Sequence, residues 1–197
     1  MSRTLPTARM PKAAQVAERL GFSYQDKATK SFRAAVSDLP EIPGGAKIRR
    51  VITGELDGRE LMIFEASYMV FTGQTMLQVA YTFYIVHAPA WPRTNITSRN
   101  FFDRLLARLG RAKGLKLDSP EFNIRFKVTS DDEDFAIALL SPQMQEFLLT
   151  KTTVKWRISQ GRVCLVYSGT LKSARIESSL QRIRGFWELV PQELERW

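Results

Sequence analysis

Cysteine and histidine are almost absent from this sequence, which holds one of each, Cys164 and His87, in 197 residues. One cysteine excludes an intramolecular disulfide, and one cysteine far from one histidine excludes the usual zinc ligand sets. Cys164 lies in an apolar run, where burial raises the pKa of a thiol. We therefore expect a structural core cysteine rather than a reactive one, and a reducing compartment.

Long hydrophobic runs are also absent. The longest apolar region, residues 76–86, is interrupted by Gln78 and Thr82, so it cannot supply the ~20 apolar residues of a membrane-spanning helix. Residues 1–12 contain basic residues and prolines without the apolar core of a secretory signal. We expect these residues to form a flexible basic arm. The protein is expected to be soluble and cytoplasmic, either free or peripheral to a membrane.

Catalytic motifs are missing as well. Gly44 and Gly45 are not followed by the Lys-Ser or Lys-Thr of a phosphate-binding loop, and no dinucleotide-binding glycine pattern occurs. His87 stands in no motif with a serine, cysteine or carboxylate, which favours polar surface over a general base. The acids at 131–134 point in different directions on a helix, which favours helix capping over a metal site. We expect no cofactor and no metal, and the sequence leans away from an enzyme.

Acidic residues are outnumbered by basic ones, 20 Asp and Glu against 29 Lys and Arg, which gives a net charge of +9 and a pI near 9.9. This balance permits anionic partners, namely nucleic acid, an anionic membrane surface or an acidic protein. Hydrophobic residues make up 44% of the chain and aromatic residues 11%, which is sufficient for a folded core.

Residue patterns predict three strands in the first half of the chain. Residues 49–56 and 59–68 form a hairpin because Asp57 and Gly58 are a favoured two-residue turn, and residues 77–85 follow as a third strand. A helix over residues 13–20 and a short helix over residues 28–36 precede them. Pro89 and Pro92 predict a loop over residues 88–97.

The stretch 122–149 predicts a strand followed by helices. Its apolar residues alternate with polar ones at Phe122, Ile124, Phe126 and Val128. Ser130 and Glu133 form a candidate capping box for a helix that begins near residue 131. Ser141 and Pro142 then predict a break and the start of a new helix.

A second hairpin and two further helices complete the predicted fold. Residues 154–158 and 163–167 are joined by a Gln160-Gly161 turn, and helices are predicted over residues 98–113 and 174–184. Strands grouped in hairpins favour an α+β fold, in which helices pack on one side of an antiparallel sheet or sheets. Residues 13–197 are expected to form a single domain, built as one unit or as two halves, 13–113 and 114–197.

A basic face is one candidate binding surface. The predicted helix 98–113 carries three arginines at i, i+4 and i+7, and two predicted strands hold two cations each, opposite their apolar residues. If those strands are neighbours, their four cations share one sheet face. The candidate residues are Arg104, Arg108, Arg111, Arg125, Lys127, Lys155 and Arg157. The aromatic residues of the strands lie on the other side, unlike those of RNA-binding sheets, so simple solvation of the outer face is favoured.

Tryptophans form a second candidate surface, since Trp and Arg are enriched at interface hot spots. Trp91 lies in the predicted loop, and Trp187 and Trp197 lie close to the C-terminal end of the sequence. These residues are expected to contact a partner.

Two groups of residues resemble an uncharacterised family of bacterial proteins of unknown function, over residues 48–150. The first group, in GELDGRELMIFEASY, is Gly54, Gly58, Arg59, Met62, Ile63, Phe64 and Tyr68. The second group is Phe122, Phe126, Val128, Asp132, Glu133, Leu139 and Leu140. The resemblance implies a shared fold and no known reaction. Similar proteins often carry membrane-spanning segments beside this domain, and this sequence contains none.

The sequence therefore favours a non-catalytic binding module, an accessory subunit of a larger assembly with a protein partner. The alternative is binding of nucleic acid or an anionic membrane surface through the basic face. An enzyme of unknown type is the third hypothesis. The sequence does not predict an oligomeric state.

Overall fold

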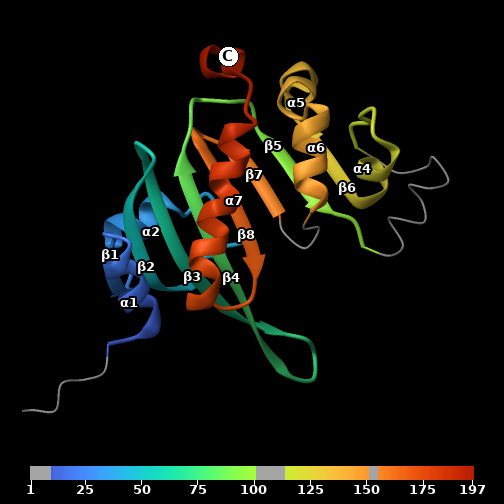
Figure 1. Ribbon diagram of the computed structural model, residues 1–197. Coiled ribbons are helices and arrows are strands. Elements are labelled where there is room, and N and C mark those ends of the chain that lie inside the picture. Colours follow the sequence, from blue (N-terminus) through green and yellow to red (C-terminus); the bar gives the residue numbers. More distant parts are fainter. Residues whose placement is uncertain (1–9, 101–113, 151–154) are drawn as a thin grey trace, which may run out of the picture.

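The computed structural model describes residues 10–100, 114–150 and 155–197, which form an α+β fold around one antiparallel sheet (Figure 1). The eight strands lie in the order β1-β2-β3-β4-β8-β7-β5-β6. They are β1 Ser23–Lys27, β2 Lys47–Leu56, β3 Arg59–Phe71, β4 Met76–His87, β5 Thr94–Ser98, β6 Phe126–Ser130, β7 Lys155–Ser159 and β8 Arg162–Ser168. The predicted α+β class is confirmed, and the described strands form one sheet rather than two.

The sheet combines a meander with an inserted hairpin. β1 to β4 follow one another in chain order, and the β7–β8 hairpin then lies between β4 and β5. Both predicted two-residue turns are present: Asp57 and Gly58 have φ angles of 51° and 79°, and Gln160 and Gly161 have φ angles of 50° and 68°. Positive φ at both central residues matches the right-handed twist of the strands they join.

Helices cover both faces of the sheet rather than the one side predicted, because β3 and β4 are apolar on both faces. On one face Ala17 of α1, Phe135 of α5 and Phe186 of α7 join Ile63 in the larger core. On the other face α2 and the loop after it place Phe32 and Val36 against Phe64 and Phe83. The helices are α1 Lys12–Arg19, α2 Lys30–Ala35, α4 Pro120–Arg125, α5 Glu133–Leu139, α6 Pro142–Leu149 and α7 Ile176–Glu188, with 3-10 turns η1 Ser173–Arg175 and η2 Gln192–Arg196.

The predicted loop over residues 88–97 is wrong in its second half. Pro89 and Pro92 do precede the strand, but β5 begins at Thr94 and pairs with β6 on one side and β7 on the other. Thr94 and Ile96 are fully buried. Two prolines therefore kept only the residues around them out of the sheet. Of the helix predicted over residues 98–113, residues 101–113 lie outside the described residues.

The strand predicted from Phe122 is also wrong in its first half. Ser119 caps a short helix, α4, by accepting a hydrogen bond from the Phe122 amide, and Pro120 occupies the first turn. β6 begins only at Phe126. The rings of Phe122 and Phe126 stack at 4.9 Å between centroids, a contact that an i, i+4 spacing also permits.

The helix starts that follow are close to those predicted. Asp132, rather than Ser130, caps α5 by accepting a hydrogen bond from the Phe135 amide at 2.9 Å, and Ser130 Oγ accepts one from the Asp132 amide. The fresh start at Ser141 is confirmed, since its hydroxyl caps α6 at the Met144 amide and Pro142 lies in the first turn.

Candidate functional site: the projecting β3–β4 hairpin

The predicted basic face is only partly assembled. Lys127 on β6 and Lys155 and Arg157 on β7 do share a sheet face, although β5 lies between their strands. Arg125 lies on α4, not on a strand, and forms an ion pair with Glu121 at 2.9 Å. Arg104, Arg108 and Arg111 lie outside the described residues.

Two of these cations bind the same buried carboxylate and so stabilise the fold. Glu41 is 8% exposed, and its Oε1 atom accepts hydrogen bonds from Lys155 Nζ and from the Arg157 guanidinium, each at 2.9 Å. A buried carboxylate needs such partners because an unpaired charge away from water is costly. Lys155 and Arg157 therefore attach the loop that holds Glu41 to β7. Nucleic-acid binding through the predicted basic face stays a prediction.

The tryptophan surface needs a correction. Trp91 is 3% exposed, and its Nε1 donates a hydrogen bond to the Leu194 carbonyl at 2.6 Å, so it belongs to the core. Trp187 is half-buried beneath the Arg59 guanidinium, which lies 4.0 Å from its ring centroid. Trp197 is 50% exposed and rests edge-on against Phe135. Together these rings fasten the C-terminal tail, and Trp197 alone of the three offers a large exposed surface.

No catalytic pair forms around His87 in the part of the chain that the structure describes. His87 is exposed at the end of β4 and lines an open hollow of about 340 Å³ with Glu60 and Arg162. Arg162 is engaged by Asp38, Gln160 and the Ala35 carbonyl. Among the described residues no hydrogen bond joins His87 to a carboxylate, and no three Asp, Glu, His or Cys side chains gather as metal ligands. Cys164 is fully buried, and burial raises the pKa of its thiol to about 12.

A long hairpin projects beyond the sheet (Figure 1), and this feature was not predicted from the sequence. β2 pairs with β3 only as far as Ser67, and β8 pairs with β4 only from Tyr81. Beyond those positions β3 and β4 continue to pair with each other up to Phe71 and Met76. Residues 68–80 therefore form a two-stranded ribbon whose arms are roughly 13 Å long at the usual rise per residue.

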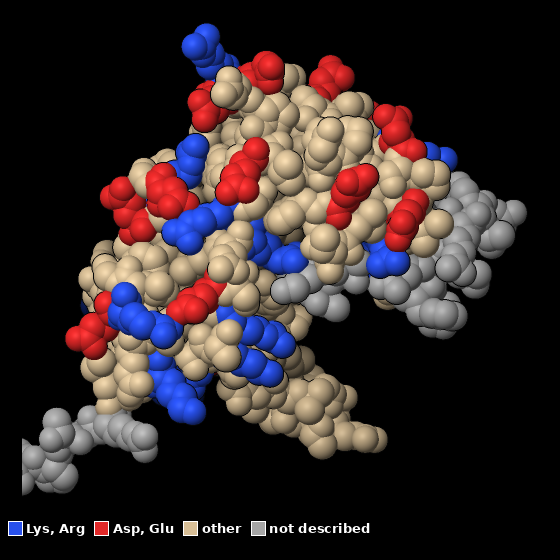
Figure 2. All heavy atoms as spheres, in the orientation of Figure 1, with Lys and Arg blue, Asp and Glu red and all other residues tan. Residues whose placement is uncertain are grey.

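The ribbon is apolar on both faces. Directly paired residues share a face, so Phe71 and Met76 lie on one side, and Val70 and Leu77 lie on the other. The exposed fractions are 53% for Met69, 37% for Val70, 66% for Phe71, 56% for Met76 and 53% for Leu77. No charged residue occurs between Glu65 and His87, and the projecting ribbon carries neither blue nor red in Figure 2.

The root of the ribbon is tied to the segment that follows β8. Glu65, which is 6% exposed, accepts hydrogen bonds from the Leu171 amide at 2.9 Å and from Arg50 at 3.2 Å. Thr82 Oγ1 donates a hydrogen bond to the Gly169 carbonyl at 3.0 Å. These contacts hold the base of the ribbon firmly, so its projecting part is presented in a defined direction.

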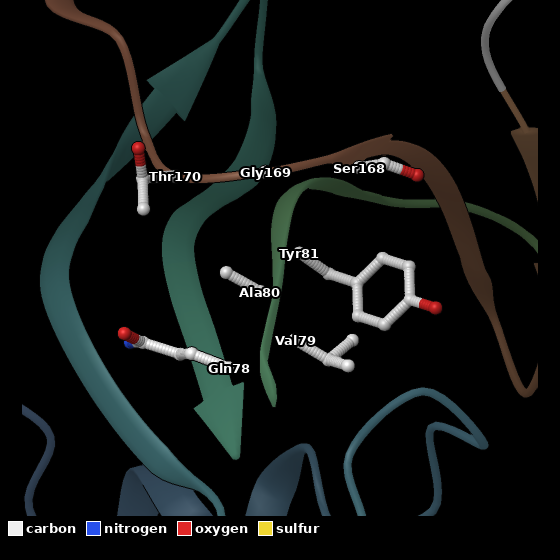
Figure 3. A pocket seen from close by; sticks show the side chains of 7 residues that line it. All are labelled: Gln78, Val79, Ala80, Tyr81, Ser168, Gly169 and Thr170. Atoms are coloured by element: carbon white, nitrogen blue, oxygen red, sulfur yellow. The ribbon is translucent and has the colours of Figure 1, made fainter. Parts of the chain in front are cut away.

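A groove of about 540 Å³ opens where the ribbon leaves the sheet (Figure 3). It is lined by residues 78–81 of β4 and residues 168–170. Val79 and Tyr81 point to one side of β4, and Gln78 and Ala80 point to the other. The groove therefore runs along the edge of β4 rather than enclosing a chamber for a small molecule.

The described residues thus define an α+β protein with a single antiparallel sheet and a projecting apolar hairpin. None of its described helices is long and apolar enough to cross a membrane. No protein-family model matches the sequence, and no curated protein matches it significantly.

Among solved structures, the fold is similar to the crystal structure of the mycobacterial trehalose monomycolate transport factor A, TtfA. The TM-score is 0.59 with 16% sequence identity, over 92% of this chain and 97% of that chain. At that identity the likeness shows a shared fold and nothing about chemistry, because one fold can host unrelated functions.

Proposed function

We propose that this protein is a non-catalytic binding module, an accessory subunit that docks on a larger assembly through the β3–β4 hairpin. The observation that carries the proposal is the ribbon of residues 68–80, which exposes apolar side chains on both faces and contains no charge. Contiguous exposed apolar surface marks interaction sites because its contact with water is unfavourable.

The edges of the ribbon support the same proposal. Proteins usually protect an exposed strand edge with lysine, proline or a bulge, since unpaired backbone groups pair readily with other chains. Residues 68–71 and 76–80 contain no lysine and no proline. In a free protein an unprotected apolar ribbon promotes unwanted association with other chains. In a protein that is normally docked, the ribbon forms the contact with the partner.

The name of TtfA adds a weaker argument. A transport factor is the kind of accessory protein that this proposal describes, and TtfA shares the fold along nearly its whole length. The catalytic hypothesis lacks a comparable argument, because His87 has no hydrogen-bonded carboxylate among the described residues.

Size-exclusion chromatography of native extract with light scattering tests the proposal. The wild-type chain should elute in a complex heavier than its own 22.5 kDa. Phe71→Ser combined with Leu77→Ser should return it to the monomer, because the pair removes apolar area from both faces of the ribbon. Ile137→Ser is the matched control, since Ile137 is 51% exposed and belongs to α5, which lies far from the hairpin (Figure 1).

Two results would contradict the proposal. One is a wild-type chain that elutes alone as a monomer. The other is a complex that survives the hairpin substitutions while the melting temperature is unchanged.

A further inference from the structure

Cations of β2 lie on the same face of the sheet as half of the ribbon's apolar side chains. Lys47 pairs with Ser67, and Arg49 pairs with Glu65. Side chains two residues apart on a strand share a face, so this face continues outward along the ribbon. There it carries the group that we name the apolar tip, which is Met69, Phe71 and Met76.

Two further cations are held at the same root. The Leu171 amide is bound to Glu65, which places Lys172 and the short turn η1 with Arg175 beside the base of the ribbon. We name Lys47, Arg49, Lys172 and Arg175 the basic collar. All four are exposed, and none forms an ion pair with a described residue. Figure 2 shows Lys and Arg side chains gathered where the uncharged ribbon leaves the body.

The acids of this region do not neutralise the collar. Glu65 is buried and bound to Arg50, and exposed Glu177 is bound to Arg19. The surface therefore joins a positive zone to an apolar zone without an intervening acid on the ribbon. That arrangement complements a bilayer whose headgroups are negative and whose interior is apolar.

We propose that the apolar tip and the basic collar together dock the protein on a lipid bilayer that contains anionic lipids. This inference rests on the proposed function, since it identifies the larger assembly on which the hairpin docks as a membrane-bound one. The collar contacts headgroup phosphates, and the apolar tip enters the boundary between headgroups and acyl chains. A single charge on the ribbon would oppose such entry, and none is present.

The depth of entry follows from the backbone. The outer edges of residues 68–71 and 76–79 have no strand partner among the described residues, and unpaired backbone groups are excluded from the hydrocarbon core. The turn is polar, with Thr72 bonded to the Thr75 carbonyl at 3.0 Å. The ribbon therefore enters the interface tip first and is immersed by about 5–10 Å, like other interfacial elements.

Immersion to that depth also explains why both faces are apolar. A groove on a protein partner would cover one face of the ribbon, whereas lipid surrounds both faces, including Val70 and Leu77. Tyr68 lies at the root of the ribbon and Tyr81 lies just inside the sheet, so these tyrosines mark the headgroup level, at which tyrosine is enriched in membrane proteins.

Flotation of the purified full-length chain with vesicles tests the inference. Vesicles of phosphatidylcholine with 30% phosphatidylglycerol, about one anionic lipid in three, should bind the wild type, and pure phosphatidylcholine should bind it at least about tenfold more weakly. Phe71→Ser with Met76→Ser should weaken binding to anionic vesicles by at least about tenfold. Lys47→Glu with Lys172→Glu should weaken it to a similar extent and remove its salt dependence.

Matched controls separate the surface from general changes. Ile137→Ser removes an equally exposed apolar side chain at a distant site, and Arg196→Glu reverses a charge in η2 at the opposite end of the molecule (Figure 1). Both should bind anionic vesicles like the wild type. Equal binding by wild type and the Phe71→Ser, Met76→Ser variant would overturn the inference, as would the absence of vesicle binding.

A second measurement reports insertion directly. Because Cys164 is fully buried, Met76→Cys provides a single accessible thiol for an environment-sensitive fluorophore. Anionic vesicles should shift its emission to the blue, and Ile137→Cys should show no shift. An unshifted Met76→Cys probe on bound protein would overturn the inference.

The two proposals fail in distinguishable ways. If vesicles do not bind but Phe71→Ser with Leu77→Ser still dissolves the complex in native extract, the partner is a protein, so the membrane inference falls and the proposed function stands. If the purified chain is a dimer that these substitutions dissociate, the occupant is a second copy and the membrane inference also falls. If hairpin substitutions change neither assay, both proposals fall.

Discussion

Cys164 shows how burial can dominate the chemistry of a residue, because it outweighs the opposing effect of the nearby Arg162 and Arg157 on the pKa of the thiol. Burial raises the pKa of its thiol from 9.0 to about 12, so the unfolded chain binds fewer protons than the folded one between those pH values. Stability from this group is complete below pH ~9 and is lost as pH rises towards ~12, with a slope of at most ~1.4 kcal/mol per pH unit. The buried thiol should therefore destabilise the folded protein at alkaline pH.

Urea unfolding of wild type and Cys164→Ala checks this prediction. At pH ~8 the wild type should be more stable, because alanine leaves a small cavity in the core. The difference in unfolding free energy should shrink as pH rises above ~9, since alanine does not titrate. A difference that stays constant up to pH ~11 would show that Cys164 ionises as readily in the folded chain as in the unfolded one.

At the scale of elements, Gly54 controls how the N-terminal segment meets β2. A Cβ atom at Gly54 would lie 2.3 Å from Cδ1 of Phe22, the residue before β1, and a ring atom has no flexible end that can give way. Gly54→Ala should displace Phe22 and lower the unfolding free energy by about 1–3 kcal/mol. Gly44→Ala, where nothing lies within 4 Å, is the control. Thermal unfolding of both variants measures the effect, and equal melting temperatures would refute the clash.

Local sequence patterns predicted most helices and strands, because the turn and cap residues that specify these elements lie next to them in the sequence. The Asp57-Gly58 and Gln160-Gly161 turns specify hairpins through positive φ, and the Ser141 cap specifies a helix start. β1 and β5 were missed for other reasons. β1 is almost entirely exposed, so it lacks the alternation of buried residues, and β5 owes its burial to strands that come later in the chain.

The candidate site was missed because a strand pattern does not reveal where a neighbouring strand ends. Leu77 and Val79 continue the alternation of a buried strand, but β8 does not reach them. A signal was nevertheless present. Met69, Val70 and Phe71 are consecutive and apolar, so both faces of the ribbon are apolar where a half-buried strand would alternate. The basic collar could not be found in this way, because its cations come from distant segments.

At the scale of the whole molecule, the sheet order joins the two ends of the chain. β4 pairs with β8, and β5 pairs with β6 and β7. Strands that precede residue 100 are therefore hydrogen-bonded to strands that follow residue 125. The Trp91 indole is bound to the Leu194 carbonyl across the same boundary. Two halves divided near residue 113 would each leave apolar strand edges open, which favours one cooperative unit over two sub-domains.

Equilibrium unfolding in urea tests that cooperativity. The whole chain should show one transition, with the same midpoint by far-ultraviolet circular dichroism and by tryptophan fluorescence, because Trp91, Trp156 and Trp187 all pack into the shared core. Fragments 1–113 and 114–197 should show no cooperative transition when separate, since β4 would lack β8 and β5 would lack both its partners. Mixing the fragments should restore the transition if they pair as in the intact sheet. Two midpoints in the whole chain, or a fragment that unfolds cooperatively alone, would mean that the shared sheet is not what stabilises each half.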